Sequence, residues 1–115
     1  MKLAADDLES YRTSIALLTV HSAISLNDAI ATAITGMKSK HQDHSGAADE
    51  LERISINPKV GNLNGVVHFR WLLHEKSRVA YGRERLDDAF VRLSITRAER
   101  FHAWAYNYFK EILHA

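Results

Sequence analysis

Residues 4–35 are one unbroken run of helix-forming residues, and this run limits what the chain can fold into. Residues 4–35 contain no proline, and Gly36 follows them as a helix stop. The rest of the chain is consistent with a helical fold, because its 115 residues include only one proline and five glycines. This composition disfavours a β-sandwich, which needs many turns.

The most apolar part of this run is residues 13–34. It carries His21, Asn27 and Asp28 near its centre, and inside a bilayer these side chains would cost several kcal/mol. The N-terminus is acidic, unlike the basic start of a signal peptide. We therefore expect a buried helix in a soluble, cytoplasmic protein that has no membrane partner.

Three further helices are expected after this one. Pro58 pushes the residue before it out of helical geometry, Gly82 ends the third helix, and Asp87 or Asp88 caps the fourth. The expected helices are therefore residues 4–35, 47–55, 66–81 and 88–113. With 46% hydrophobic and 25% charged residues, residues 1–115 suit one globular domain. The sequence predicts an all-α fold, namely an antiparallel up-and-down four-helix bundle.

Several classes of chemistry are excluded or disfavoured by residues that the chain lacks. It has no cysteine, which excludes disulfides, cysteine-ligated zinc and a thiol nucleophile. It also lacks the HExxH motif, a glycine-rich phosphate loop and a nucleophile elbow. His41, Asp43 and His44 are ligand types that transition metals favour, but their spacing matches no established zinc motif. We therefore expect no metal site and no cofactor.

Charge is distributed unevenly along the chain, although the formal net charge is only +1. Residues 1–57 hold five basic residues against eight acidic ones, a net −3, whereas residues 58–115 hold ten against six, a net +4. The basic excess is typical of a solvated helix face. The alternative is that it binds an anionic partner, such as RNA or an acidic protein.

Up-and-down order would bring together residues that are far apart in the sequence. The end of the first helix, the loop after it, the end of the third helix and the start of the fourth would share one end of the bundle. Five polar side chains would then be neighbours: His41, His44, Tyr81, Arg83 and Arg85. A tyrosine at a helix end is more often a packing residue, and the alternative is a phenol that faces a ligand.

The first and fourth helices carry apolar residues on two sides. In the helix at 88–113, one stripe includes Phe101 and Trp104, and a second stripe includes Ala105 and Phe109. A helix that is apolar on two sides is buried on two sides. In so small a domain this predicts a homodimer through the first and fourth helices, and the alternative is a monomer with a wide core.

Two pairs of residues have the types that catalysis needs. His21 and Asp28 are two helical turns apart and face the same way. The carboxylate could orient the histidine as a general base or as a ligand-binding group, and the simpler alternative is a buried polar pair. Arg97 can stabilise charge on a phosphate and His102 can move a proton. However, a five-residue offset places their side chains about 140° apart on a straight helix, so they converge poorly within one chain.

Four stretches carry a resemblance to a known family: SIALLTVHSAISLNDAIATA at 14–33, HQDHSGAADEL at 41–51, LLHEKSRVAYG at 72–82 and RAERFHAWA at 97–105. Together they resemble short bacterial members of the HEPN-like superfamily, which are four-helix bundles that commonly dimerise. Such members share residues that here would be His21, Asp28, Asp43, His44, Lys76 and Tyr81.

The resemblance also implies a set of possible activities. Active members are metal-independent RNases that use an arginine followed four to six residues later by a histidine, and Arg97 and His102 fit this spacing. The residue after that arginine is usually polar, whereas Ala98 stands here. Other members lack the catalytic pair and act as binding or interaction modules.

We therefore expect a dimeric, HEPN-like binding module that holds a nucleotide or RNA without catalysis. The expected ligand-binding residues are His21, Asp28, His44, Lys76, Tyr81 and Arg83. The first alternative is a toxin-type RNase in which Arg97 and His102 are catalytic. The second alternative is an antitoxin-like or purely structural partner protein.

Overall fold

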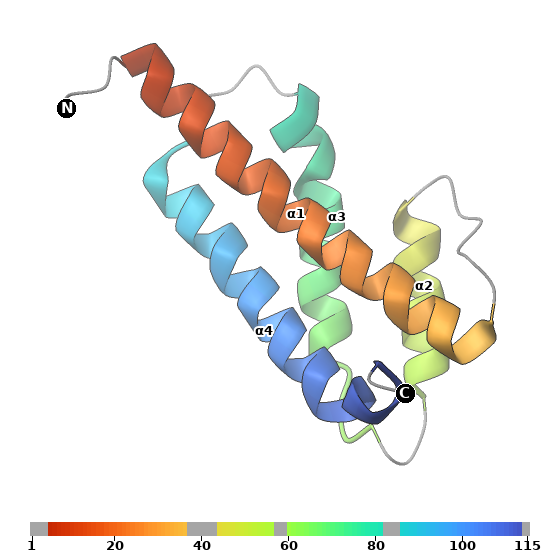
Figure 1. Cartoon of the computed structure of the whole chain (residues 1–115). Coiled ribbons are helices and arrows are strands. Elements are labelled where there is room, and N and C mark those ends of the chain that lie inside the picture. The colour runs from red at the N-terminus through yellow and green to blue at the C-terminus, as the bar shows by residue number, and fades with distance from the viewer. Residues whose placement is uncertain (1–4, 37–43, 57–59, 82–85, 114–115) are drawn as a thin grey trace.

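The computed structural model describes residues 5–36, 44–56, 60–81 and 86–113, with side chains for 8–36, 46–56, 60–76, 78–79 and 86–110. Within these residues the chain forms four helices and no strand (Figure 1). They are α1 (Ala5–Thr35), α2 (His44–Ser55), α3 (Asn64–Tyr81) and α4 (Asp88–Leu113). The predicted all-α, four-helix class is confirmed, and the helix ends lie within three residues of the expected ones.

The direction of the helices differs from the expected alternation. Arg12 pairs with Asp88, and Ser22 lies beside His102, so α1 and α4 run parallel, while α3 runs antiparallel to both (Figure 1). α2 runs in the same sense as α1. The connection allows this, because the eight residues between α1 and α2 can span about 27 Å when extended. That exceeds the roughly 18 Å length of a twelve-residue helix.

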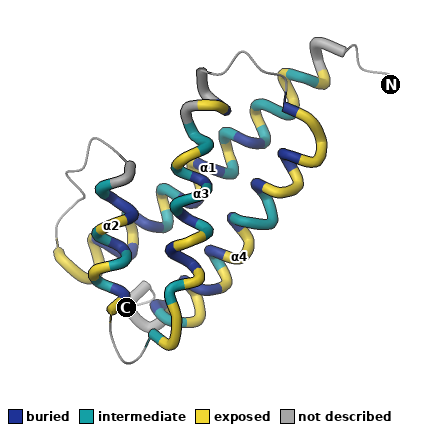
Figure 2. Tube along the Cα trace, turned by 180° about the vertical axis from the view of Figure 1, so that it is seen from behind, coloured by how far each residue is buried: buried dark blue, intermediate teal, exposed yellow. Residues whose placement is uncertain are grey.

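The core lies where α1, α3 and α4 meet, and α2 packs on α1 and α3 at one end (Figure 2). Phe69 of α3 stacks on Phe101 of α4 with ring centroids 4.9 Å apart, and both are fully buried. A smaller cluster around Phe90 and Val79 fills the other end. Arg70 joins α3 to α2 through Asp49 (2.7 Å) and Glu52 (3.1 Å).

The helix ends follow local sequence signals. Gly36 ends α1 with φ +71°, in the left-handed region that favours glycine, and its N–H donates to the Thr32 carbonyl at 2.8 Å. Asp87 caps α4 by accepting the Phe90 N–H at 2.7 Å. At the start of α3, the Asn62 side chain accepts the Asn64 N–H at 3.0 Å, and the helix begins two residues earlier than expected.

The outer side of α1 is largely uncharged. Among residues 13–35 only Asp28 carries a full charge, and the side chains of Tyr11 and Leu18 are 61% and 70% exposed. α1 is long and apolar enough to cross a membrane by length and composition, a test that core helices of soluble proteins also pass, and a third of that stretch is buried in the bundle.

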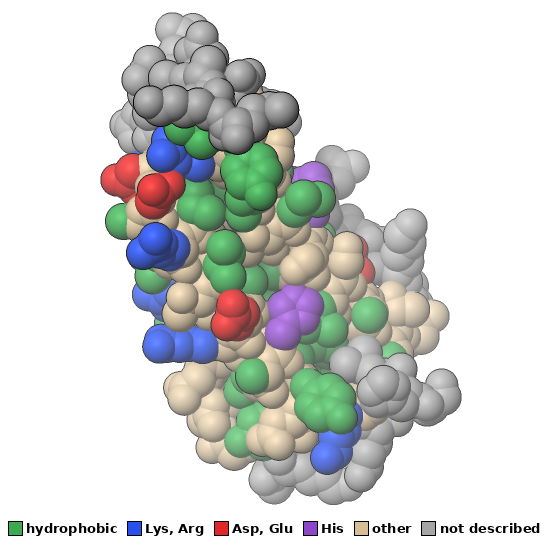
Figure 3. Space-filling model, turned by 60° about the vertical axis from the view of Figure 1, so that its left-hand side comes forward, with side chains coloured by type: hydrophobic (Ala, Val, Ile, Leu, Met, Phe, Trp, Pro, Cys, Tyr) green, Lys and Arg blue, Asp and Glu red, His purple; other side chains and the backbone are tan. Residues whose placement is uncertain are grey.

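The two apolar stripes of α4 have neighbours within the same chain. α4 packs on both α1 and α3, so helices of its own chain cover much of both stripes. The apolar width of α4 therefore does not by itself require a second copy. On the side of the molecule shown in Figure 3, hydrophobic side chains are scattered over the middle of the surface, and most of the basic side chains lie along one edge, with acidic ones among them.

Candidate functional site

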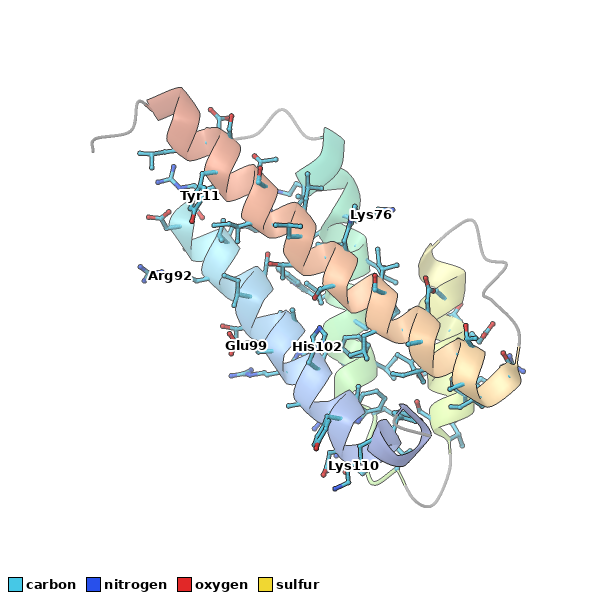
Figure 4. All side chains as sticks on the ribbon, viewed as in Figure 1. Tyr11, Lys76, Arg92, Glu99, His102 and Lys110 are labelled. Carbon is cyan, nitrogen blue, oxygen red and sulfur yellow. The ribbon has the colours of Figure 1, made fainter. Side chains whose placement is uncertain are left out.

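The site expected at one end of the bundle required the ends of α1 and α3 to lie side by side. They lie at opposite ends of the molecule, because these two helices run antiparallel (Figure 1). Lys76 is half-buried on α3 (Figure 4). His44 begins α2 and Tyr81 ends α3, but their side chains, and the whole of His41, Asp43, Arg83 and Arg85, lie outside the described residues.

His21 and Asp28 do not bond to each other. Seven residues correspond to a rise of roughly 10 Å along a helix, which is beyond the reach of a direct hydrogen bond. His21 is exposed and Asp28 is half-buried. The polar residue that α1 buries is their neighbour Asn27, which is 2% exposed. Within one chain, the two residues therefore do not form the pair that a general base needs.

Arg97 and His102 contact different helices. Arg97 Nη1 lies 3.3 Å from His68 Nδ1 on α3, whereas His102 Nε2 lies 3.1 Å from Ser22 Oγ on α1. Figure 4 shows His102 between α4 and α1. This divergence follows from their offset of about 140° around the helix. One chain thus keeps apart the two groups that the RNase alternative needs together.

The structure instead brings Arg97 to His68, which the sequence analysis did not single out. The guanidinium also lies over the Trp71 ring, 5.4 Å from its centroid, in cation–π geometry. A guanidinium only donates hydrogen bonds, so Nδ1 of His68 accepts and the neutral ring carries its proton on Nε2. Arg97 therefore fixes both the position and the tautomer of this imidazole.

His68 faces an open groove of about 540 Å³ between the start of α3 and the second half of α4. This hollow is the α3–α4 groove. Its lining consists of Asn62, Asn64, His68, Arg100, Ala103, Trp104, Tyr106, Asn107 and Tyr108. This lining contains no carboxylate, and it combines hydrogen-bond donors with aromatic surface. Such a groove suits a ligand that is rich in acceptors.

The electrostatics of the groove are cationic. Partial burial lowers the pKa of His68, and the nearby positive charges of Arg97 and Arg100 lower it further. At neutral pH the neutral form of the imidazole therefore predominates. The charge of Arg100 remains in the groove, where its side chain is exposed.

The floor of the groove depends on one close approach between helices. Trp104 packs directly against the backbone of Gly65, where the space for a Cβ is already occupied by the indole. The indole Nε1–H donates to the Asn62 carbonyl at 3.1 Å, and the Asn62 amide donates to the Tyr108 hydroxyl at 3.3 Å. These bonds hold the segment before α3 against α4.

A metal centre has no support in the described part of the chain, which contains no group of three or more side chains suited to hold a metal ion. The comparisons with known proteins also give no relative from which a role could be taken. No protein-family model, no curated protein and no solved structure matches the chain. The HEPN-like resemblance of the sequence therefore stays a prediction.

Proposed function

We propose that the chain is a HEPN-like helical module that binds a nucleotide or a single strand of RNA without cleaving it, through the α3–α4 groove. The observation that carries the proposal is a cation and an imidazole set among aromatic side chains, with no carboxylate in the lining. Phosphate supplies the acceptors that Arg100 can bind, and bases stack on aromatic rings.

The size of the groove supports the same ligand class. A volume of about 540 Å³ lies within the usual range of small-molecule sites. Tyr106 lies at the edge of the groove and is 58% exposed, and the Lys110 ammonium over its ring, 5.8 Å from the centroid, adds positive charge beside the aromatic surface. Trp104 is nearly buried and acts as part of the floor.

The test is the binding of a fluorescently labelled hexauridylate, measured by anisotropy at several salt concentrations. Arg100→Gln removes one phosphate contact, so we expect about tenfold weaker binding and a salt slope reduced by about 1. Arg92→Gln is the matched control, because Arg92 is also an exposed arginine of α4 but does not line the groove. Equal loss in both variants, or no binding by the wild type, would refute the proposal.

The same RNA also separates binding from cleavage. We expect it to stay intact after incubation with the protein in EDTA. Cleavage by the wild type that disappears in His102→Ala would replace the binding function with the RNase alternative. Because Arg97 and His102 contact different helices, such cleavage would also require a second copy to supply one of the two groups.

A further inference from the structure

We propose that an anion and a proton bind together at the α3–α4 groove: His68 accepts the proton at Nδ1, and its contact with Arg97 then breaks. This inference rests on the proposed function and concerns how the same site is regulated.

The geometry of the Arg97–His68 contact explains why this contact breaks when His68 takes up a proton. Nδ1 accepts from Arg97 Nη1 at 3.3 Å only while it is unprotonated. A proton on Nδ1 turns it into a donor that faces another donor, because a guanidinium has no acceptor atom. The contact cannot survive this change, so protonation of His68 releases the Arg97 guanidinium.

The positive charges around His68 disfavour protonation of its ring while the groove is empty. The charged groups that act on His68 are Arg97 and Arg100, both on α4. The nearest carboxylate on the same face of α3, Glu75, lies two turns away and pairs with Arg78 at 3.7 Å. On α2, Asp49 and Glu52 are bound to Arg70. The other titratable side chains in the groove are the phenols of Tyr106 and Tyr108.

An anion in the groove reverses this balance. Its negative charge lies beside His68 and stabilises the imidazolium, so the pKa of His68 is higher in the complex than in the free protein. The proton comes from solvent, and no bond to the ligand is made or broken. By linkage, the anion then binds more tightly as the pH falls from neutral toward the pKa of His68 in the free protein. The affinity for the anion then changes by at most about tenfold per pH unit.

The test is the pH dependence of hexauridylate binding between about pH 5.5 and 8. This RNA has hydroxyl groups at both ends, and none of its own groups titrates in that interval. The variants are His68→Gln, whose amide oxygen still accepts from Arg97 but takes up no proton, and His74→Gln, the control. His74 is on the same helix, and its side chain is 86% exposed.

We expect binding by the wild type and by His74→Gln to strengthen steadily as the pH falls, and binding by His68→Gln to stay level. RNA binding with no pH dependence, or with a dependence that persists in His68→Gln, overturns the coupling and leaves the proposed function standing. Absence of RNA binding at every pH overturns both.

A second measurement uses the wild-type protein alone, so it does not depend on whether a variant folds. Nitrogen-detected NMR of the histidine rings distinguishes an acceptor Nδ1 from a protonated one. At a pH just below neutral we expect one ring to shift from the neutral Nε2–H form toward imidazolium when hexauridylate is added. A bound complex in which every ring keeps its free form contradicts the proposal.

Discussion

Gly65 sets the distance between α3 and α4 at the groove. Any side chain there must displace the Trp104 ring, because the space for a Cβ is filled by the indole. We expect Gly65→Ala to lower the free energy of unfolding by about 1–3 kcal/mol, the usual range for overpacking, and to weaken RNA binding as Asn62 moves away from Trp104. Urea unfolding measures the first effect and anisotropy the second.

The matched control for this substitution is Gly61→Ala. A Cβ at Gly61 would lie 3.0 Å from the Tyr108 hydroxyl, which is the far end of a side chain and can move away. The loss of stability should therefore be clearly smaller than for Gly65→Ala. Equal stability of Gly65→Ala and the wild type would show that Trp104 can move at little cost and does not fix the groove.

At the scale of the elements, the start of α1 is joined to the start of α4 by an exposed ion pair. Arg12 Nε lies 2.7 Å from Asp88 Oδ1, and this hydrogen bond together with the charge of Arg12 lowers the pKa of Asp88. A lowered pKa means that the unfolded chain binds more protons, so the contribution is present above the ordinary pKa and is lost as the pH falls.

We therefore expect Asp88→Asn to be less stable than the wild type at neutral pH and equal to it in strong acid, as measured by urea midpoints at both pH values. Glu99→Gln serves as the control, because it also removes an exposed carboxylate from α4. A stability difference between Asp88→Asn and the wild type that is the same at both pH values would contradict this assignment.

The ends of the helices could be predicted from sequence, whereas their directions could not. Gly36 and Asp87 are local signals, and each acts within one turn of its own helix. α2 could run either in the same direction as α1 or in the opposite direction. The eight residues between the two helices are long enough for both arrangements.

The Arg97–His68 contact at the candidate site could not be predicted from the sequence for a related reason. Arg97 and His68 are 29 residues apart on two helices, so their contact depends on the register of α3 against α4, which no spacing rule encodes. The five-residue offset of Arg97 and His102, in contrast, was a local property. It predicted their divergence correctly.

At the scale of the whole molecule, we expect two copies to associate through α1 and α4. The exposed apolar side chains Leu18 on α1 and Leu93 on α4 support this prediction. Light scattering after gel filtration should give the mass of a dimer for the wild type and of a monomer for Leu18→Glu. Val67→Glu, at an exposed apolar residue of α3, should remain dimeric, and a monomeric wild type would refute the prediction.

The parallel pairing of α1 with α4 has a consequence for synthesis. Arg12 finds its partner Asp88 only 76 residues later in the chain, which at about 5–20 residues per second takes roughly 4–15 s of translation. During that time the largely apolar α1 has only α2 and α3 to pack against. A nascent chain stalled before α4 would therefore leave α1 open to chaperones, and the bundle can close only after α4 has left the ribosome.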